Sequence, residues 1–265
     1  MTMSKRINLT ASMLRAYKSC PRLYELQYVE MLNPTVAPAY LTDGSNYHGC
    51  VESILKGEPY KAEGKVASMA RAFERFIPWR EWDVKEIESE FDITLTRFCH
   101  MVGKIDAVRA DDSPVEHKTT SAAIDEKYIN ALAWDDQIPF YLLAQSLKTG
   151  KPVTSVTYTV CQKPTIKQTQ KETSEEYLQR VEAWYDETRV KVVTAVRSIA
   201  ELKETYTEIL EIAGEIRRRK RFYRNPSNCR IMGCSFASIC LNYDPQITTG
   251  FVKKERMSEE LSCNF

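Results

Sequence analysis

Two short stretches decide the fold: Gly103–Asp106, which reads GKID, and Val115–Lys118, which reads VEHK. Residues 88–98 before them alternate apolar and polar residues, residues 101–109 and 115–119 continue as further strands, and a DDSP turn separates these last two segments. This pattern predicts two neighbouring strands of a β-hairpin. Side chains two positions apart on a strand face the same side, so Glu116 and Lys118 point together. Pairing across the hairpin brings Asp106 beside them.

Two carboxylates and an ammonium group on one face of a sheet are costly to bury without a compensating partner. A divalent cation is such a partner, because Mg²⁺ binds a few carboxylates and keeps positions open for a phosphate oxygen and an attacking water. Lys118 can act on that water, or on the charge that develops on the phosphate. The alternative interpretation is an ordinary polar face of a hairpin.

Outward from the hairpin, the sequence predicts helices on both sides and further strands. The expected helices cover residues 10–31 with a break at Pro21, 46–56, 62–76, 125–147 and 174–221, and the expected strands cover 88–98, 101–109, 115–119 and 153–160. The last 25 residues are polar and are not expected to form a regular element. This order predicts an α/β or α+β domain with a small central sheet.

The chain has 265 residues, of which 43% are hydrophobic, and this is sufficient to bury a sizeable core. The formal net charge of +1 neither requires nor excludes a nucleic-acid partner, because a basic groove can exist within a neutral total. No stretch of about 18 apolar residues exists, so no membrane association is expected. The N-terminus lacks the apolar centre of a secretory signal. We therefore expect a cytoplasmic location, or the host cytoplasm if a phage encodes the chain.

Two further positions flank the hairpin along the chain. His48 lies at the start of the expected helix 46–56, where a neutral imidazole can supply another metal ligand. Gln137 and Tyr141 are four residues apart on the helix after Lys118, so they share one face of that helix. Gln137 can hydrogen-bond to the site or to the substrate backbone. The alternatives are a histidine without a ligand role and an ordinary core or solvated helix face.

Eight cysteines in a chain expected in a reducing compartment point to metal binding rather than to disulfides. Three of them, Cys229, Cys234 and Cys240, form a compact group after Pro226, and Cys20 near the N-terminus is the best fourth ligand. A zinc site and free buried thiols are the alternatives. The remaining cysteines are interpreted as small buried hydrophobic residues: Cys50, Cys99, Cys161 and Cys263.

A basic run comes just before the cysteine group and consists of Arg217, Arg218, Arg219, Lys220 and Arg221. The aromatic residues Phe222 and Tyr223 follow it directly. Such a run can contact the phosphates of DNA while the aromatic rings stack on bases. It is equally consistent with positive charge placed favourably at the C-terminus of a helix.

Taken together, these residues resemble the RecB-like branch of the PD-(D/E)xK nucleases. That branch carries an upstream histidine, a G-x-x-D strand, an E-x-K strand and a Q-x-x-x-Y helix. The same order runs here through His48, Gly103–Asp106, Glu116–Lys118 and Gln137–Tyr141. Ile105 stands where the name of the superfamily places proline. The resemblance implies an α/β, restriction-endonuclease-like core, with a small mixed sheet flanked by helices.

The resemblance also implies roles for these residues in Mg²⁺- or Mn²⁺-dependent hydrolysis of DNA. The implied catalytic residues are Asp106, Glu116, Lys118, Gln137 and Tyr141. The implied metal ligands are His48, Asp106, Glu116 and the main-chain carbonyl of His117. Lys118 would act on the attacking water.

The C-P-x-x-Y element at Cys20–Tyr24 and the later cysteine group are similar to the iron–sulfur subgroup of this branch. Its members include CRISPR-associated RecB-like exonucleases and related phage exonucleases. The resemblance implies that Cys20, Cys229, Cys234 and Cys240 hold a [4Fe-4S] cluster that joins the N- and C-terminal segments. Four residues separate the first two cysteines of the later group, whereas the CRISPR-associated members usually have two there, so a phage recombination exonuclease is favoured.

We therefore expect one nuclease domain over residues 1–265. Its parts are an N-terminal helical part (1–80), the catalytic sheet and helix (81–165), a helical part with the cysteine group (166–245) and a tail (246–265). The expected activity is that of a DNA exonuclease in recombination, repair or spacer processing. The expected partner is DNA, at its ends. A recombination or CRISPR partner protein and a homo-oligomer are further possibilities for its assembly. An endonuclease of the same fold and an inert DNA-binding module are the alternatives.

Overall fold

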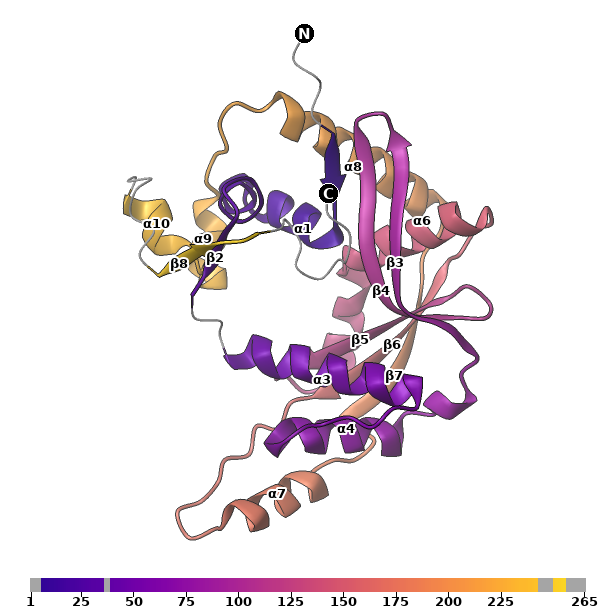
Figure 1. Cartoon of the computed structure of the whole chain (residues 1–265), viewed down its shortest axis with the longest axis vertical. Coiled ribbons are helices and arrows are strands. Elements are labelled where there is room, and N and C mark those ends of the chain that lie inside the picture. Colours follow the sequence, from indigo (N-terminus) through magenta and orange to yellow (C-terminus); the bar gives the residue numbers. More distant parts are fainter. Residues whose placement is uncertain (1–5, 36–38, 243–249, 256–265) are drawn as a thin grey trace. The chain divides into compact units, whose positions relative to one another are not determined.

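The computed structural model describes residues 6–35, 39–242 and 250–255 (Figure 1). The helices, strands and short turns follow one another in this order: β1 (Ile7–Leu9), α1 (Ala11–Ser19), α2 (Pro21–Tyr24), η1 (Glu25–Val29), β2 (Leu32–Pro34), α3 (Ala39–Lys56), α4 (Gly64–Phe76), η2 (Trp79–Glu81), β3 (Val84–Thr96), β4 (Cys99–Arg109), β5 (Pro114–Thr120), α5 (Glu126–Ala131), η3 (Leu132–Trp134), α6 (Gln137–Thr149), β6 (Ser155–Gln162), α7 (Ser174–Ala183), β7 (Val190–Val196), α8 (Ile199–Arg218), α9 (Pro226–Met232), α10 (Ala237–Asn242) and β8 (Phe251–Lys253).

The chain divides into two compact units, which are described separately. One comprises residues 38–89 and 105–202, and the other comprises residues 1–37, 90–104 and 203–265. The expectation of a single nuclease domain over the whole chain stays a prediction. Of the tail expected from residue 246, only residues 250–255 belong to the described part, and they include β8. None of the helices in the described residues is both long and apolar enough to span a membrane.

The unit of residues 38–89 and 105–202 is built on a mixed sheet. Its strands follow the order β4-β5-β6-β7, in which β4–β5 and β6–β7 are antiparallel and β5–β6 is parallel. A parallel pair requires a crossover connection, which α5, η3 and α6 supply between β5 and β6. The prediction of an α/β fold with a small mixed sheet flanked by helices is confirmed.

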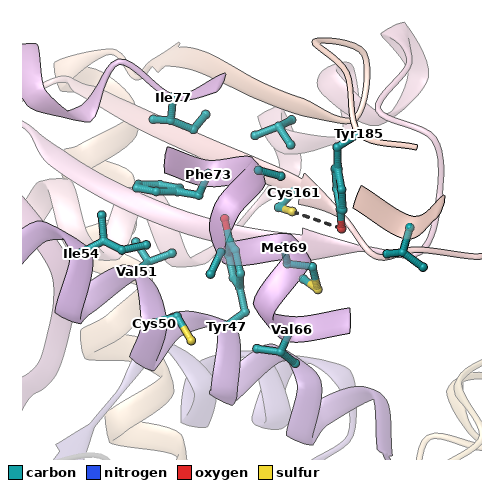
Figure 2. Close-up of a cluster of buried hydrophobic side chains, with 14 of the residues drawn as sticks. Tyr47, Cys50, Val51, Ile54, Val66, Met69, Phe73, Ile77, Cys161 and Tyr185 are labelled. Atoms are coloured by element: carbon teal, nitrogen blue, oxygen red, sulfur yellow. Dashed lines mark hydrogen bonds between the residues drawn. The ribbon is translucent and has the colours of Figure 1, made fainter. Parts of the chain in front are cut away.

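Helices cover both faces of this sheet. On one face, α3, α4 and α7 pack against Cys161 and Val190 of the strands through a buried cluster that includes Tyr47 and Phe73 (Figure 2). On the other face, Ile138 and Leu142 of α6 pack against Val156, Tyr158 and Val160 of β6. Because both faces are buried, the side chains of β5 lie between two apolar layers.

The unit of residues 1–37, 90–104 and 203–265 brings together segments from both ends of the sequence. Strand β1 pairs in parallel with β4, and β2 pairs with β8 in an antiparallel ribbon. The Tyr17 hydroxyl donates to the Glu215 carboxylate at 2.8 Å, and Lys18 pairs with Glu208 at 2.8 Å. Hence α1 and α8 are in contact, although Tyr17 and Glu215 are 198 residues apart along the chain.

The helix expected over residues 125–147 is interrupted. Helix α5 ends at Ala131, the short turn η3 follows, and α6 begins only at Gln137. The Asp135 carboxylate accepts the main-chain N–H of Gln137, the first residue of α6, at 3.0 Å. The prediction of one continuous helix was wrong, because η3 and Asp135 separate α5 from α6.

The prediction of a helix over residues 174–221 was also wrong in the middle of this range. Strand β7 lies between α7 and α8 and pairs along its length with β6. Its sequence VKVVTAV is rich in β-branched residues, which favour a pleated strand over a helix. The helical pattern on either side concealed this short strand.

The interpretation of Cys50, Cys99 and Cys161 as small buried residues is confirmed, since their exposed fractions are 4%, 2% and 0%. Cys263 lies outside the described residues.

Two glycine substitutions test the packing. A β-carbon added at Gly103 would lie 2.6 Å from Cζ of Phe91, whereas one added at Gly49 in α3 would have no neighbour within 4 Å. We expect Gly103→Ala to lower the free energy of unfolding by about 1–3 kcal/mol, because the buried Phe91 ring must move. The matched Gly49→Ala should raise it by about 0.5–1 kcal/mol through helix propensity. Chemical denaturation measures both, and an equal effect of the two substitutions would contradict this packing.

Candidate active site

The β4–β5 ladder stops where the candidate site begins. The paired residues are Ala107 with Val115 and Val108 with Pro114, so the next step of the register would place Asp106 opposite Glu116. Instead of continuing the ladder, the main-chain N–H of His117 donates to Oδ2 of Asp106 at 2.8 Å. The Asp106 carboxylate therefore takes a position that a main-chain carbonyl would occupy in a regular ladder.

Glu116 is almost completely buried, with an exposed fraction of 3%, and its Oε2 atom has no hydrogen-bond partner. Burial and the negative charge of Asp106 raise the pKa of Glu116 to about 7. For Asp106, burial acts in the same direction, but His48 and the N–H of His117 outweigh it and lower its pKa. The two carboxylates are thus close enough for one to oppose ionisation of the other.

His48 belongs to α3 and lies on the Asp106 side of the site, with Nδ1 at 3.6 Å from Oδ2 of Asp106. Burial lowers the pKa of His48, but the Asp106 carboxylate raises it more, so the net change is upward. The preceding residue, Tyr47, is completely buried in the core beneath α3 (Figure 2). This anchor fixes the rotation of α3 and hence the position of His48.

The ammonium group of Lys118 has three acceptors. Its Nζ lies 2.9 Å from Oε1 of Glu116, 3.1 Å from Oδ2 of Asp135 and 2.7 Å from Oε1 of Gln137. Burial lowers the pKa of Lys118, but Glu116 and Asp135 together raise it above its ordinary value. Lys118 is therefore a fixed positive charge rather than a free base at neutral pH.

Gln137 and Tyr141 share one face of α6, as expected. Gln137 accepts from Lys118 and donates through Nε2 to the Tyr141 hydroxyl at 2.9 Å. Asp135 was not among the expected site residues, although it contacts both Lys118 and the first turn of α6. The sequence placed Asp135 inside an expected continuous helix over 125–147, and only the contact with Lys118 distinguishes it.

The imidazole of His117 lies on the other face of β5. Its Nδ1 is 2.7 Å from Oγ1 of Thr159, and its ring packs edge-on against Phe73 at 5.6 Å between centroids. Burial lowers the pKa of His117 to about 4, so the ring is neutral at physiological pH. The family resemblance implied only the main-chain carbonyl of His117 as a metal ligand, and this role stays a prediction.

The donor set at this site suits a hard divalent cation. Two carboxylates and an imidazole lie together, and the buried Oε2 of Glu116 lacks any partner. Mg²⁺ and Mn²⁺ take carboxylate oxygen ligands of this kind. In the described part of the chain, however, no three His, Cys, Asp or Glu side chains form a group that could hold a metal ion as they stand, so the ligand set of His48, Asp106 and Glu116 stays a prediction.

The four expected cluster cysteines all belong to the unit that contains both ends of the chain. Cys20 lies between α1 and α2, and its Sγ accepts the main-chain N–H of Asn225 at 3.3 Å. The side chains of Asn225 and Asn228 donate to the Ser19 carbonyl at 2.9 and 2.5 Å. These hydrogen bonds bring the segment with Cys229 against the segment with Cys20.

Two thiols of this group, those of Cys234 and Cys240, have raised pKa values. Burial raises the pKa of Cys234, and Cys229, Cys20 and Cys240 raise it further. Burial also raises the pKa of Cys240, while Arg224 and Arg22 lower it. All seven cysteines in the described residues are free thiols. In the described residues no three of these cysteines form a group that could hold a metal ion, so the cluster stays a prediction.

The basic run lies at the end of α8, whose last residue is Arg218. The Arg217 guanidinium stacks over Phe98 at 3.8 Å from the ring centroid. Arg219 lies over Tyr223 at 4.8 Å and pairs with Glu215 at 3.0 Å. Both expectations for this run therefore keep support: its charge complements a helix C-terminus, and an exposed aromatic residue, Tyr223, lies beside it.

Comparisons with known proteins agree with this geometry. Residues 8–241 match the family model of the PD-(D/E)XK nuclease superfamily. A protein from Eubacterium rectale named "Putative exonuclease" has a similar structure, with a TM-score of 0.58 at 10% identity over 89% of this chain and 88% of that one. Among curated proteins, a sequence search finds no match.

Two further solved structures show lower similarity. A phage-related exonuclease from Haemophilus somnus 129PT has a TM-score of 0.41 at 12% identity, over 80% of this chain and 94% of that chain. An alkaline exonuclease from Laribacter hongkongensis has a TM-score of 0.37 at 13% identity, over 80% of this chain and 88% of that chain.

The raised pKa of Glu116 predicts a pH dependence of stability. The folded protein binds a proton on Glu116 up to about pH 7, whereas the unfolded chain releases it near the ordinary value of 4.5. Between these values the folded state holds more protons, so this group's contribution to the free energy of unfolding falls as the pH rises. We expect Glu116→Gln to remove this decrease, measured by urea denaturation in the presence of a chelator.

The wild type must be compared with Glu116→Gln, because His117 changes the free energy of unfolding with pH in the opposite direction to Glu116. Its pKa is lowered from 6.5 to about 4, so its contribution to stability rises with pH over that range. This contribution is common to the wild type and to Glu116→Gln and cancels in their difference. Parallel pH profiles for the two proteins would contradict the assignment of a raised pKa to Glu116.

Proposed function

The chain belongs to the PD-(D/E)XK nuclease superfamily, and on this premise we propose that it is a divalent-metal-dependent deoxyribonuclease that hydrolyses phosphodiester bonds at DNA ends. The observation that carries the proposal is the pair Asp106 and Glu116, held side by side where the β4–β5 ladder stops, with Lys118 bound to Glu116. A carboxylate pair of this kind is costly in a folded protein without a cation to compensate it.

His48, Asp106 and Glu116 would hold the cation, with the His117 carbonyl as a further ligand. The partnerless Oε2 of Glu116 and the Asp106 carboxylate supply the hard oxygen donors that Mg²⁺ or Mn²⁺ requires. When bound, the ion supplies Lewis-acid activation of the phosphodiester and of the attacking water.

The chain's own residues supply the remaining parts of the reaction. Lys118 keeps its proton at Nζ, because Glu116 and Asp135 raise its pKa, and so offers a positive charge to the phosphate as negative charge develops. Gln137 fixes the direction of Nζ through its Oε1, and Tyr141 fixes Gln137 in turn. We assign Gln137, Tyr141 and Asp135 the role of positioning Lys118.

A preference for DNA ends is the finer part of the proposal. The similar protein from Eubacterium rectale carries the name of an exonuclease, and this name favours end-directed cleavage over internal cleavage. An endonuclease with the same site remains the alternative within this class.

We further propose that Cys20, Cys229, Cys234 and Cys240 bind a [4Fe-4S] cluster that joins the N- and C-terminal segments. The support is the effect of Cys20 and Cys229 on the pKa values of Cys234 and Cys240, and the hydrogen bonds that hold the two segments together. Arg22 and Arg224 beside Cys240 favour the thiolate form that a metal cluster requires. Zinc bound by the same thiols is the alternative.

The basic run Arg217–Arg221 is our candidate for contact with DNA phosphates. Stacking of Arg217 on Phe98 and of Arg219 on Tyr223 restrains two of these cations. Restrained cations lose less conformational entropy when they bind phosphate, which favours such a contact.

Removal of either Glu116 or Lys118 tests the activity. We expect Glu116→Gln and Lys118→Ala to lower the rate of cleavage of end-labelled linear DNA by about a thousandfold or more, because each removes a group that acts on the reacting phosphate. A chelator should abolish cleavage by the wild type, and added Mg²⁺ or Mn²⁺ should restore it.

Closed circular DNA is the matched substrate. Resistance of the circular DNA supports end-directed cleavage. Cleavage of the circular DNA would show that the protein is an endonuclease rather than an exonuclease. If the wild type cleaves neither substrate with either metal, the active-nuclease proposal fails and an inert DNA-binding module takes its place.

Elemental analysis of anaerobically purified protein tests the cluster. We expect iron near four atoms per chain in the wild type, the content of one [4Fe-4S] cluster, and a loss of most of this iron in Cys229→Ser. The matched control is Cys99→Ser, which changes a buried thiol outside the group and should keep its iron. Zinc in place of iron, or iron content unaffected by Cys229→Ser, would contradict the cluster.

A further inference from the structure

Trp134 is the most exposed large hydrophobic side chain in the described residues, with an exposed fraction of 88%. The other tryptophans behave differently: Trp79, Trp82 and Trp184 are partly buried and pack against the core cluster on the α3–α4 face of the sheet. An indole presented almost entirely to solvent buries nothing within its own chain. Trp134 therefore contributes little to the packing of the fold, and a role in binding is the better explanation.

The turn that carries Trp134 is fixed from beneath. Nη2 of Arg197, which has an exposed fraction of only 5%, donates to the carbonyls of Leu132 and Ala133, both at 3.0 Å. Leu132 itself is buried in the cluster beneath α5 and α6. A buried arginine that holds the two preceding carbonyls makes this turn rigid, so the exposed indole stands on a preorganised support.

The same turn reaches the candidate active site. Asp135, the next residue, contacts Nζ of Lys118 at 3.1 Å and starts α6 through the N–H of Gln137. Neighbouring Cα atoms are about 3.8 Å apart, which places the backbone of Trp134 at about 10 Å or less from the lysine ammonium. The rise is about 3.4 Å per nucleotide in a duplex and larger in an unstacked strand, so this distance spans at most about three nucleotides.

We propose that Trp134 is a nucleobase-stacking residue, which binds an unpaired base of the DNA strand a few nucleotides from the phosphate held at Lys118. The proposal rests on the proposed nuclease function and adds the substrate class, a single-stranded DNA segment. Aromatic side chains stack on any base, so this contact binds the strand without sequence preference. Its neighbour Asp135 connects the stacking residue directly to the group that contacts the phosphate.

Kinetics on a labelled single-stranded oligonucleotide with Mg²⁺ tests the proposal. Trp134→Ala should raise KM about tenfold and leave kcat little changed, because a lost stacking contact weakens strand binding rather than chemistry. Trp134→Phe should retain most of the affinity. The matched control is Leu147→Ala, which removes a 44% exposed apolar side chain at the far end of α6, about 15 Å from Gln137.

A series of oligonucleotides with one abasic residue locates the contact. The wild type should lose about tenfold in kcat/KM when the abasic residue reaches one position, and Trp134→Ala should be insensitive to it at that same position. Equal KM values for the wild type and Trp134→Ala would overturn the proposal. So would a raised KM in Trp134→Ala while the wild type is insensitive to every abasic position.

A binding measurement separates this proposal from the proposed function. Quenching of tryptophan fluorescence by the oligonucleotide in a chelator requires no cleavage, and it should be largely lost in Trp134→Phe, which keeps the three partly buried tryptophans. Absence of cleavage by the wild type would contradict the nuclease. Quenching that is equal in the wild type and Trp134→Phe would contradict base stacking by Trp134.

Discussion

The structure of the site depends on one hydrogen bond, from the main-chain N–H of His117 to the Asp106 carboxylate. This bond satisfies a buried donor that the ladder no longer serves, and it holds a second carboxylate next to Glu116 at the end of the paired segment. A hydrogen-bonded carboxylate stays ionised, and its charge then raises the pKa of the neighbouring Glu116. This single hydrogen bond thus lies where the sheet pairing ends, and it keeps the Asp106 carboxylate close enough to Glu116 to repel it. A bound cation would offset this repulsion.

Side chains of the layers on both faces of the sheet hold these charged groups in place. Tyr47 fixes α3 beneath His48, while Asp135 and Gln137 at the start of α6 hold the ammonium of Lys118 against Glu116. The site is therefore supported from both faces of the sheet, by side chains whose positions the core determines. Arg197 extends the same principle to the turn of Trp134, since it uses a buried cation to hold an exposed aromatic ring.

The hairpin and its charged residues could be predicted from the sequence because turn and strand signals are local. The DDSP turn between Asp106 and Glu116 joins two paired strands in the structure, and the spacing of Gln137 and Tyr141 gave their shared helix face. The interruption at Asp135 and the strand β7 could not be predicted in this way. Both depend on tertiary partners, namely the ammonium of Lys118 and the neighbouring strand β6, which leave no periodic signal in the sequence.

The central claim is that Asp106 and Glu116 form a divalent-cation site, and a crystal structure with Mn²⁺ tests it most directly. The account predicts an anomalous scattering peak in contact with both carboxylates in the wild type, and its loss in Asp106→Asn. A wild-type structure at saturating Mn²⁺ that shows no peak there, with Glu116 still paired to Lys118, would contradict it.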